Sequence, residues 1–88
     1  MEENYLFKLD NATIKAIQTK VGAKADGMIG SETIKKLQEF LNDENSAGLA
    51  ADGKFGTNTI KALQNYVGVK ADGAFGPLTA EAVKTKFA

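Results

Sequence analysis

The sequence predicts an all-α domain, a small bundle of four short helices arranged as two similar helix–loop–helix halves. Four threonines, at positions 13, 33, 59 and 79, are each followed by apolar residues with the i, i+3, i+7 spacing of one helix face. A longer period is also visible, because "TIKAIQTKVGAKADG" from Thr13 matches "TIKALQNYVGVKADG" from Thr59 at most positions. No segment has the alternating apolar and polar pattern of a strand.

These repeats indicate one domain in residues 10–88, preceded by a lead-in of residues 1–9. The two halves are expected at 10–42 and 51–88, joined by a polar connection at 43–50. A chain of 88 residues is too short for two independent cores. Each half has one thin apolar face, so we expect the halves to be stable only when packed together.

The first and third helices are expected to begin and end at equivalent positions. The first begins after Asp10, whose side chain suits an N-cap, and the third begins after Gly56. They end at Gly22 and Gly68, where a left-handed residue after the helix favours glycine. Their apolar stripes are Ile14, Ile17 and Val21 in the first helix, and Ile60, Leu63 and Val67 in the third.

The second and fourth helices are expected to begin after Gly30 and Gly76. Pro77 directly follows Gly76, and proline is favoured at the first helical position. This register places Thr33 and Thr79 at the third helical position, from which a hydroxyl can reach back toward the N-cap. The apolar stripes are Ile34, Leu37 and Leu41 in the second helix, and Ala80, Val83 and Phe87 in the fourth.

Three loops share the pattern D-G-x-φ-G-x-x-T, where φ is a large apolar residue; we call them the DG loops, Asp26–Thr33, Asp52–Thr59 and Asp72–Thr79. The aspartate can accept a hydrogen bond from the backbone amide two residues on, and the glycine allows positive φ, which together make a tight turn. The residue after the glycine is expected to point outward. The φ residues, Ile29, Phe55 and Phe75, are expected to fill the core, and Phe55→Ala should then cost about 3–5 kcal/mol.

The DG loops do not match the known ligand-binding loops they superficially resemble. Each offers one carboxylate, whereas a calcium loop needs several oxygen ligands and a late glutamate. A phosphate-binding loop has more glycines and a lysine at the helix start. We therefore interpret the DG loops as structural joints and predict no metal ion and no cofactor.

Composition narrows the possible functions further. Eleven basic residues balance eleven acidic ones, so the basic excess of a nucleic-acid or anionic-membrane binder is absent. The chain has no cysteine and no histidine, which removes thiolate chemistry and the commonest general base. No stretch is apolar enough to cross a membrane, and "MEENYLF" is unlike a secretory signal. We expect no catalysis, no nucleic-acid partner and no membrane partner.

The arrangement "LQEFLN…ADGKFGTNT…ALQNYVGVKADGAFGPLT" resembles the peptidoglycan-binding domain of bacterial cell-wall hydrolases and phage endolysins. The resemblance covers about residues 34–88, and residues 10–33 look like a further half-unit of the same kind. It departs from the common pattern in a shorter third helix and in having Asn45 and Ser46 where many members have Gly-Tyr. The matching residues are Leu37-Gln38, Leu41-Asn42, Asp52 to Gly56 with Thr59, Leu63-Gln64, Gly68-Val69, and Asp72 to Pro77 with Thr79.

This resemblance implies a non-catalytic module that targets a linked lytic enzyme, a phage endolysin or an autolysin, to the bacterial cell wall. The partner would be peptidoglycan, through its sugar chain, its peptides or both. The parent protein or a phage lysis system would deliver the module to the wall, because the chain shows no signal peptide.

The chemistry of peptidoglycan suggests contact residues. Aromatic rings stack on sugar faces, and amide or charged side chains match acetamido groups, amides and carboxylates. Phe40 and Tyr66 lie beside the apolar stripes and are either half-exposed for such stacking or an extension of the core. We place the ligand in a groove bounded by the third helix and the two later DG loops, with Gln38 and Gln64 facing sideways off their helices. The candidate ligand-binding residues are Gln38, Phe40, Lys54, Asn58, Gln64, Tyr66, Lys70 and Asp72.

Two other classes of function remain open at the level of sequence. The first is a helical protein–protein interaction domain with the same fold and no affinity for the wall. The second is a small enzyme that uses Asp52 or Asp72 as a general acid, for which Glu44 is the plausible second carboxylate.

Overall fold

A computed structural model describes residues 9–87 of the chain and contains four α-helices and no strand within that range. The all-α prediction is confirmed. The predicted lead-in, residues 1–9, lies outside the described residues except for Leu9. The helices are α1 (Asn11–Val21), α2 (Ser31–Asn45), α3 (Thr57–Val67) and α4 (Pro77–Phe87).

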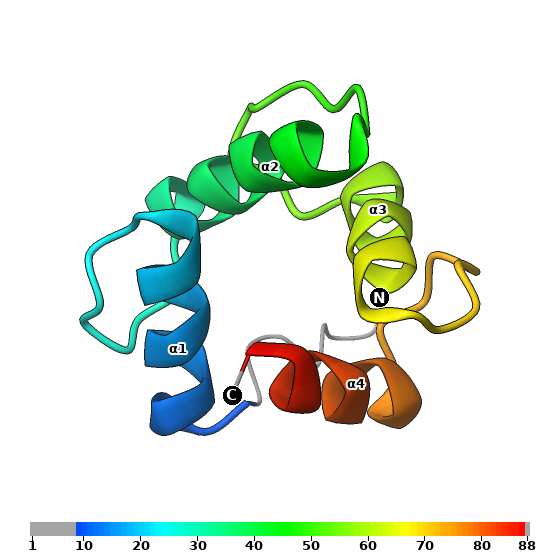
Figure 1. Ribbon diagram of the computed structural model, residues 1–88. Coiled ribbons are helices and arrows are strands. Elements are labelled where there is room, and N and C mark those ends of the chain that lie inside the picture. Colours follow the sequence, from blue (N-terminus) through cyan, green and yellow to red (C-terminus); the bar gives the residue numbers. More distant parts are fainter. Residues whose placement is uncertain (1–8, 88) are drawn as a thin grey trace.

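The four helices form a closed ring (Figure 1). Each helix packs against two neighbours, in the pairs α1–α2, α2–α3, α3–α4 and α4–α1. Helices that face each other across the ring make no close backbone approach, because the side chains of the core lie between them. The last helix therefore closes the ring against the first without a covalent connection at that corner.

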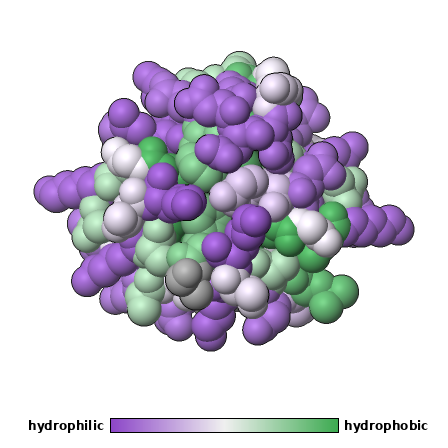
Figure 2. Space-filling view, in the orientation of Figure 1, coloured by the Kyte–Doolittle hydropathy of each residue, from purple (hydrophilic) through white to green (hydrophobic). Residues whose placement is uncertain are grey.

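The core occupies the centre of the ring and is built from the predicted stripes. Leu37 of α2, Leu63 of α3 and Val83 of α4 are almost completely buried. Hydrophilic side chains cover most of the periphery of the face seen in Figure 2. Three stripe residues, Val21, Val67 and Ala80, are only half-buried. The buried cluster consists of Ile17, Leu37, Leu41, Ile60, Ala62, Leu63, Phe75, Val83 and Phe87.

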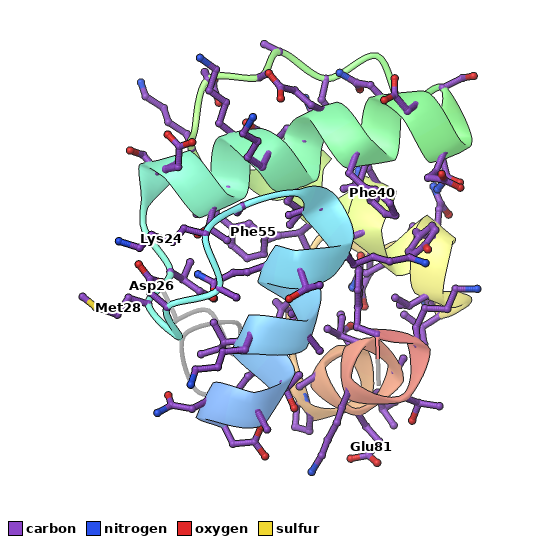
Figure 3. All side chains as sticks on the ribbon, turned by 60° about the vertical axis from the view of Figure 1, so that its left-hand side comes forward. Lys24, Asp26, Met28, Phe40, Phe55 and Glu81 are labelled. Carbon is purple, nitrogen blue, oxygen red and sulfur yellow. The ribbon has the colours of Figure 1, made fainter. Side chains whose placement is uncertain are left out.

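The DG loops place their apolar residues against this core to different depths. Phe75 is buried, and the Phe55 ring packs on it in a T-shaped arrangement with 5.8 Å between centroids. Phe55 and Ile29 also pack against the core, as expected, but they are only half-buried. The cost of Phe55→Ala should accordingly fall below the range for a fully buried ring. The preceding residue points outward as predicted: Met28 is 71% exposed and projects away from the first DG loop (Figure 3).

Most of the helix ends agree with the sequence analysis. Asp10 caps α1, its Oδ1 accepting a hydrogen bond of 2.8 Å from the Thr13 amide. Gly22 and Gly68 follow α1 and α3 in the left-handed conformation, both with φ 86°. Pro77 is the first residue of α4.

The end of α2 differs from the prediction. The helix continues to Asn45, so the expected connection at 43–50 begins at Ser46 instead. Ser46 ends the helix in the left-handed conformation, with φ 53°. The Asn42 side chain then binds the backbone N–H and C=O of Leu49 at 2.7 and 2.9 Å, which folds the connection back toward the helix. Sequence polarity suggested a loop here, but the first three polar residues extend the solvent face of the helix.

Candidate functional site

A buried glutamine anchors each DG loop to the helix before it. In the second loop, Gln38 Nε2 donates to Asp52 Oδ1 at 3.1 Å, to the Lys54 carbonyl at 2.9 Å and to Thr59 Oγ1 at 2.9 Å. Its Oε1 accepts from the Gly53 amide at 2.9 Å. An amide has two N–H donors, so at least one of them is shared between acceptors. One side chain thus connects α2, the loop and the first turn of α3.

The same arrangement occurs at all three DG loops. Gln18 binds the first loop through Asp26, Met28, Gly27 and Thr33, at 2.9–3.1 Å. Gln64 binds the third loop through Asp72, Ala74, Gly73 and Thr79, at 2.9–3.0 Å. The structural repeat is therefore one helix, one DG loop and the first turn of the next helix. This repeat occurs three times around the ring and supports the interpretation of the loops as joints.

These contacts correct the expected orientation of two glutamines and show what the threonine hydroxyls bind. Gln38 and Gln64 are each 1% exposed, so they do not face sideways into solvent as expected. The hydroxyls of Thr33, Thr59 and Thr79 accept from the glutamine amides, and the Thr33 hydroxyl also reaches back past the N-cap, donating to the Met28 carbonyl at 3.5 Å. The glutamines are buried because each DG loop turns a backbone carbonyl and a threonine hydroxyl inward, and these acceptors need a buried donor.

The fourth corner, between α4 and α1, lacks this joint. Lys84 stands five residues after Thr79, the position that the glutamines occupy after the other threonines. Its Nζ lies 4.0 Å from Asp10 Oδ2, and both side chains are more than half exposed. Exposed ion pairs contribute little stability, so this corner depends on core packing.

The aspartates of the DG loops are ionised acceptors. The backbone amide of Lys54, followed by the Gln38 side chain, lowers the pKa of Asp52 below its ordinary value of 3.8. The pKa values of Asp26 and Asp72 are lowered in the same way, by the Met28 and Ala74 amides first and then by Gln18 and Gln64. A general acid needs a raised pKa, so Asp52 and Asp72 have the opposite of the property that the enzyme hypothesis requires.

These shifts predict acid sensitivity. Since folding lowers the pKa of the three aspartates, their ionised forms stabilise the fold above pH 3.8, and this contribution is lost as the pH falls through the lowered values. We expect Asp52→Asn to reduce stability near pH 7 and to make the loss of stability below about pH 4 shallower. Urea unfolding of both proteins across this pH range checks the prediction. An unchanged acid slope in the variant would contradict it.

A groove of about 720 Å³ runs between the α2–α3 connection and the outer face of α3, a size typical of small-ligand sites. The small apolar wall comes from the connection and from Ala62 of α3. Gln38, Thr59 and Asp52 form part of its floor with their hydrogen bonds already satisfied. The exposed polar side chains on its rim are Asn45, Lys54, Thr57, Asn58, Lys61 and Asn65.

The groove contains part of the predicted site. Lys54 and Asn58 line it as rim residues, and Gln38 lies beneath it. The expected second wall, the third DG loop, is replaced by the connection, and Lys70 and Asp72 do not line the groove. Sequence reasoning missed Asn45, Lys61 and Asn65, although the spacing of Asn58, Lys61 and Asn65 places them on one face of α3.

Phe40 and Tyr66 lie in a different place and extend the core. Their rings pack edge to face at 5.3 Å, and each also contacts the ring of Phe87, at 6.3 and 5.7 Å respectively. The Lys86 ammonium lies 5.0 Å from the Tyr66 ring centroid. Burial, and to a lesser degree the Glu44 charge, raises the pKa of Tyr66. Of the two interpretations left open for these aromatics, the geometry favours the extension of the core.

No protein-family model, curated protein or solved structure matches the chain. The described residues form a small all-α ring that carries an open groove beside α3. None of its helices between residues 9 and 87 is both long and apolar enough to span a membrane. In the same part of the chain, no group of three or more acidic side chains gathers in a way that could hold a metal ion.

Proposed function

We propose that the domain is a non-catalytic module that binds bacterial peptidoglycan and holds a linked lytic enzyme, such as a phage endolysin or an autolysin, at the cell wall. The groove is the observation that carries this proposal. Its floor is satisfied within the fold, while the three asparagines on its rim make no hydrogen bond to another residue among 9–87. Unused amides and ammonium groups around a hollow match the amides, acetamido groups and carboxylates of the wall polymer.

The resemblance of the DG loops to those of peptidoglycan-binding domains supports the same function. The loops contribute the scaffold, since their polar atoms are used by the buried glutamines. Ligand contact is left to the side chains that project from α3 and from the end of α2. A module of this kind raises the concentration of an attached catalytic domain beside its substrate without doing chemistry itself.

Sedimentation with washed sacculi, before and after acid removal of teichoic acids, tests this proposal. We expect the bound fraction to survive removal of teichoic acids, because the ligand is peptidoglycan itself. Asn58→Ala should weaken binding by about tenfold, whereas Tyr66→Ala should lower thermal stability and leave the affinity of the folded protein unchanged.

The alternatives give different outcomes in the same assay. Binding that disappears with the teichoic acids would assign the module to the secondary polymer. Failure to bind either preparation would favour the protein–protein interaction domain of the same fold. Circular dichroism of each variant separates a lost contact from a lost fold.

A further inference from the structure

We infer that the groove holds the peptide part of the wall polymer, a short alanine-rich chain with a free carboxylate, and not its sugar chain. This inference rests on the proposed function and specifies the ligand class of the same groove. Three properties of the groove support it: the absence of aromatic lining, the spacing of its free amides and the position of its lysines.

Among residues 9–87, no aromatic side chain lines the groove. A sugar ring presents a flat apolar C–H face, and a protein covers such a face best with a flat aromatic ring. The rings of Phe40 and Tyr66 are engaged with each other and with Phe87, and they lie outside the groove. The apolar wall instead consists of methyl-sized and branched aliphatic groups, Ala47, Leu49, Ala50 and Ala62, which match the methyl groups of alanine residues.

The free amides on the rim are spaced for an extended peptide. Asn58 and Asn65 project from the same face of α3, seven residues and therefore about 10 Å apart along the helix. Extended peptide advances about 3.3 Å per residue, so this distance corresponds to about three residues of ligand. Each asparagine offers two donors and one acceptor, which suits the C=O and N–H groups of peptide bonds. Asn45 adds a third amide from the end of α2.

Two lysines supply the charge that a carboxylate needs. Among residues 9–87 the observed ion pair joins Lys84 to Asp10, so neither Lys54 nor Lys61 forms an ion pair with a described carboxylate, although the Lys54 charge is near enough to help lower the pKa of Asp52. The one acid of the lining, Asp52, already accepts from the Lys54 amide at 2.9 Å and from Gln38. The stem of Lys61 runs across Gly73, with its Cε 3.4 Å from the position a Cβ would occupy there. The stem therefore passes close to the Gly73 backbone, and the ammonium group makes no hydrogen bond or ion pair to another residue among 9–87.

Three soluble probes test the inference on the full chain. They are a synthetic stem pentapeptide ending in D-Ala-D-Ala, the same peptide with its C-terminus amidated, and sugar strands stripped of peptide by an amidase. Calorimetry measures affinity, and ¹⁵N NMR shifts locate the bound probe. We expect the pentapeptide to shift the signals of Asn58, Lys61 and Asn65, and amidation to weaken its binding by about fivefold to tenfold.

A matched pair of lysine variants isolates the carboxylate contact. Lys61→Gln should weaken binding of the pentapeptide. It should also abolish the difference in affinity between the peptide with a free C-terminal carboxylate and the amidated peptide. Lys15→Gln should change neither, although Lys15 occupies the equivalent helical position and its Cε lies at the same 3.4 Å from a Cβ position, at Gly27. Equal effects of the two variants would overturn the assignment of the carboxylate to this groove.

The other outcomes separate this inference from the proposed function. Binding of sacculi and sugar strands without binding of the pentapeptide would overturn the inference and leave wall binding intact. Pentapeptide binding with shifts confined to residues outside the groove would also overturn it. Failure of sacculi, strands and pentapeptide alike to bind would contradict both the inference and the proposed function.

Discussion

Gln38→Glu is expected to lower the free energy of unfolding by about 3–5 kcal/mol, a large share of the stability of a small domain. The replacement keeps the size and shape of the side chain, so no cavity forms. It replaces the N–H donors, which now face Asp52 Oδ1, the Lys54 carbonyl and Thr59 Oγ1, with an acceptor. The introduced charge would also be buried beside the Asp52 carboxylate.

Urea unfolding of Gln38→Glu beside two controls measures this effect. Gln38→Met removes the donors and also the Oε1 that accepts from the Gly53 amide, without adding charge, so its smaller expected loss, about 2–3 kcal/mol, measures the cost of the lost hydrogen bonds without a buried charge. Asn65→Asp makes the same chemical change on the exposed face of α3 and should alter stability by no more than about 0.5 kcal/mol. If Gln38→Glu were as mild as Asn65→Asp, the buried glutamine would not be what holds the joint together.

Gly73→Ala is expected to destabilise the fold by about 3 kcal/mol, from two sources. Gly73 has φ 80°, a left-handed conformation that disfavours any residue with a Cβ. A Cβ at this position would also lie 2.8 Å from Thr57 Cγ2 in the first turn of α3. The loop glycine is therefore needed for close approach as well as for the turn.

Gly68→Ala separates these two sources. Gly68 has φ 86°, but a Cβ there would meet nothing within 4 Å, so the loss should be about 1–2 kcal/mol from conformation alone. Adding Thr57→Ser to Gly73→Ala removes the obstructing methyl group and should restore about 1 kcal/mol or more. Thermal and urea unfolding of four variants, Gly68→Ala, Gly73→Ala, Thr57→Ser and the double variant, give these differences. Additive effects of Gly73→Ala and Thr57→Ser would show that the close contact carries no energy.

The helices could be predicted from sequence because their signals are local. The apolar stripe, the capping residue Asp10, and Pro77 at the start of the last helix each depend on a few neighbouring positions. The end of α2 could not be placed in this way. Polar residues there are compatible with both a loop and a solvent-facing helix, and the choice depends on the contacts of Asn42 with Leu49.

The candidate site was predicted less completely, for physical reasons. From sequence alone, a glutamine beside an apolar stripe is expected to be a surface residue, because the loop that buries it is not yet placed. The recurrence of Gln18, Gln38 and Gln64 five residues after a threonine was nevertheless a usable signal. The groove depends on how residues 46–50 fold back over α3, which local pattern does not specify. Lys54 and Asn58 were found because they flank a recognisable loop, whereas Asn45 and Lys61 needed the three-dimensional arrangement.

The unlinked corner of the ring determines how the domain would respond to mechanical force. The last turn of α4 lies against the beginning of α1 (Figure 1), where the exposed pair of Lys84 and Asp10 replaces a buried joint. Tension applied through these two helix ends would separate the α4–α1 interface by breaking its contacts one after another. Such tension would not load the three glutamine-anchored DG loops at the same time. Phe87, buried at the end of α4, is the first side chain that such a pull would have to extract from the core.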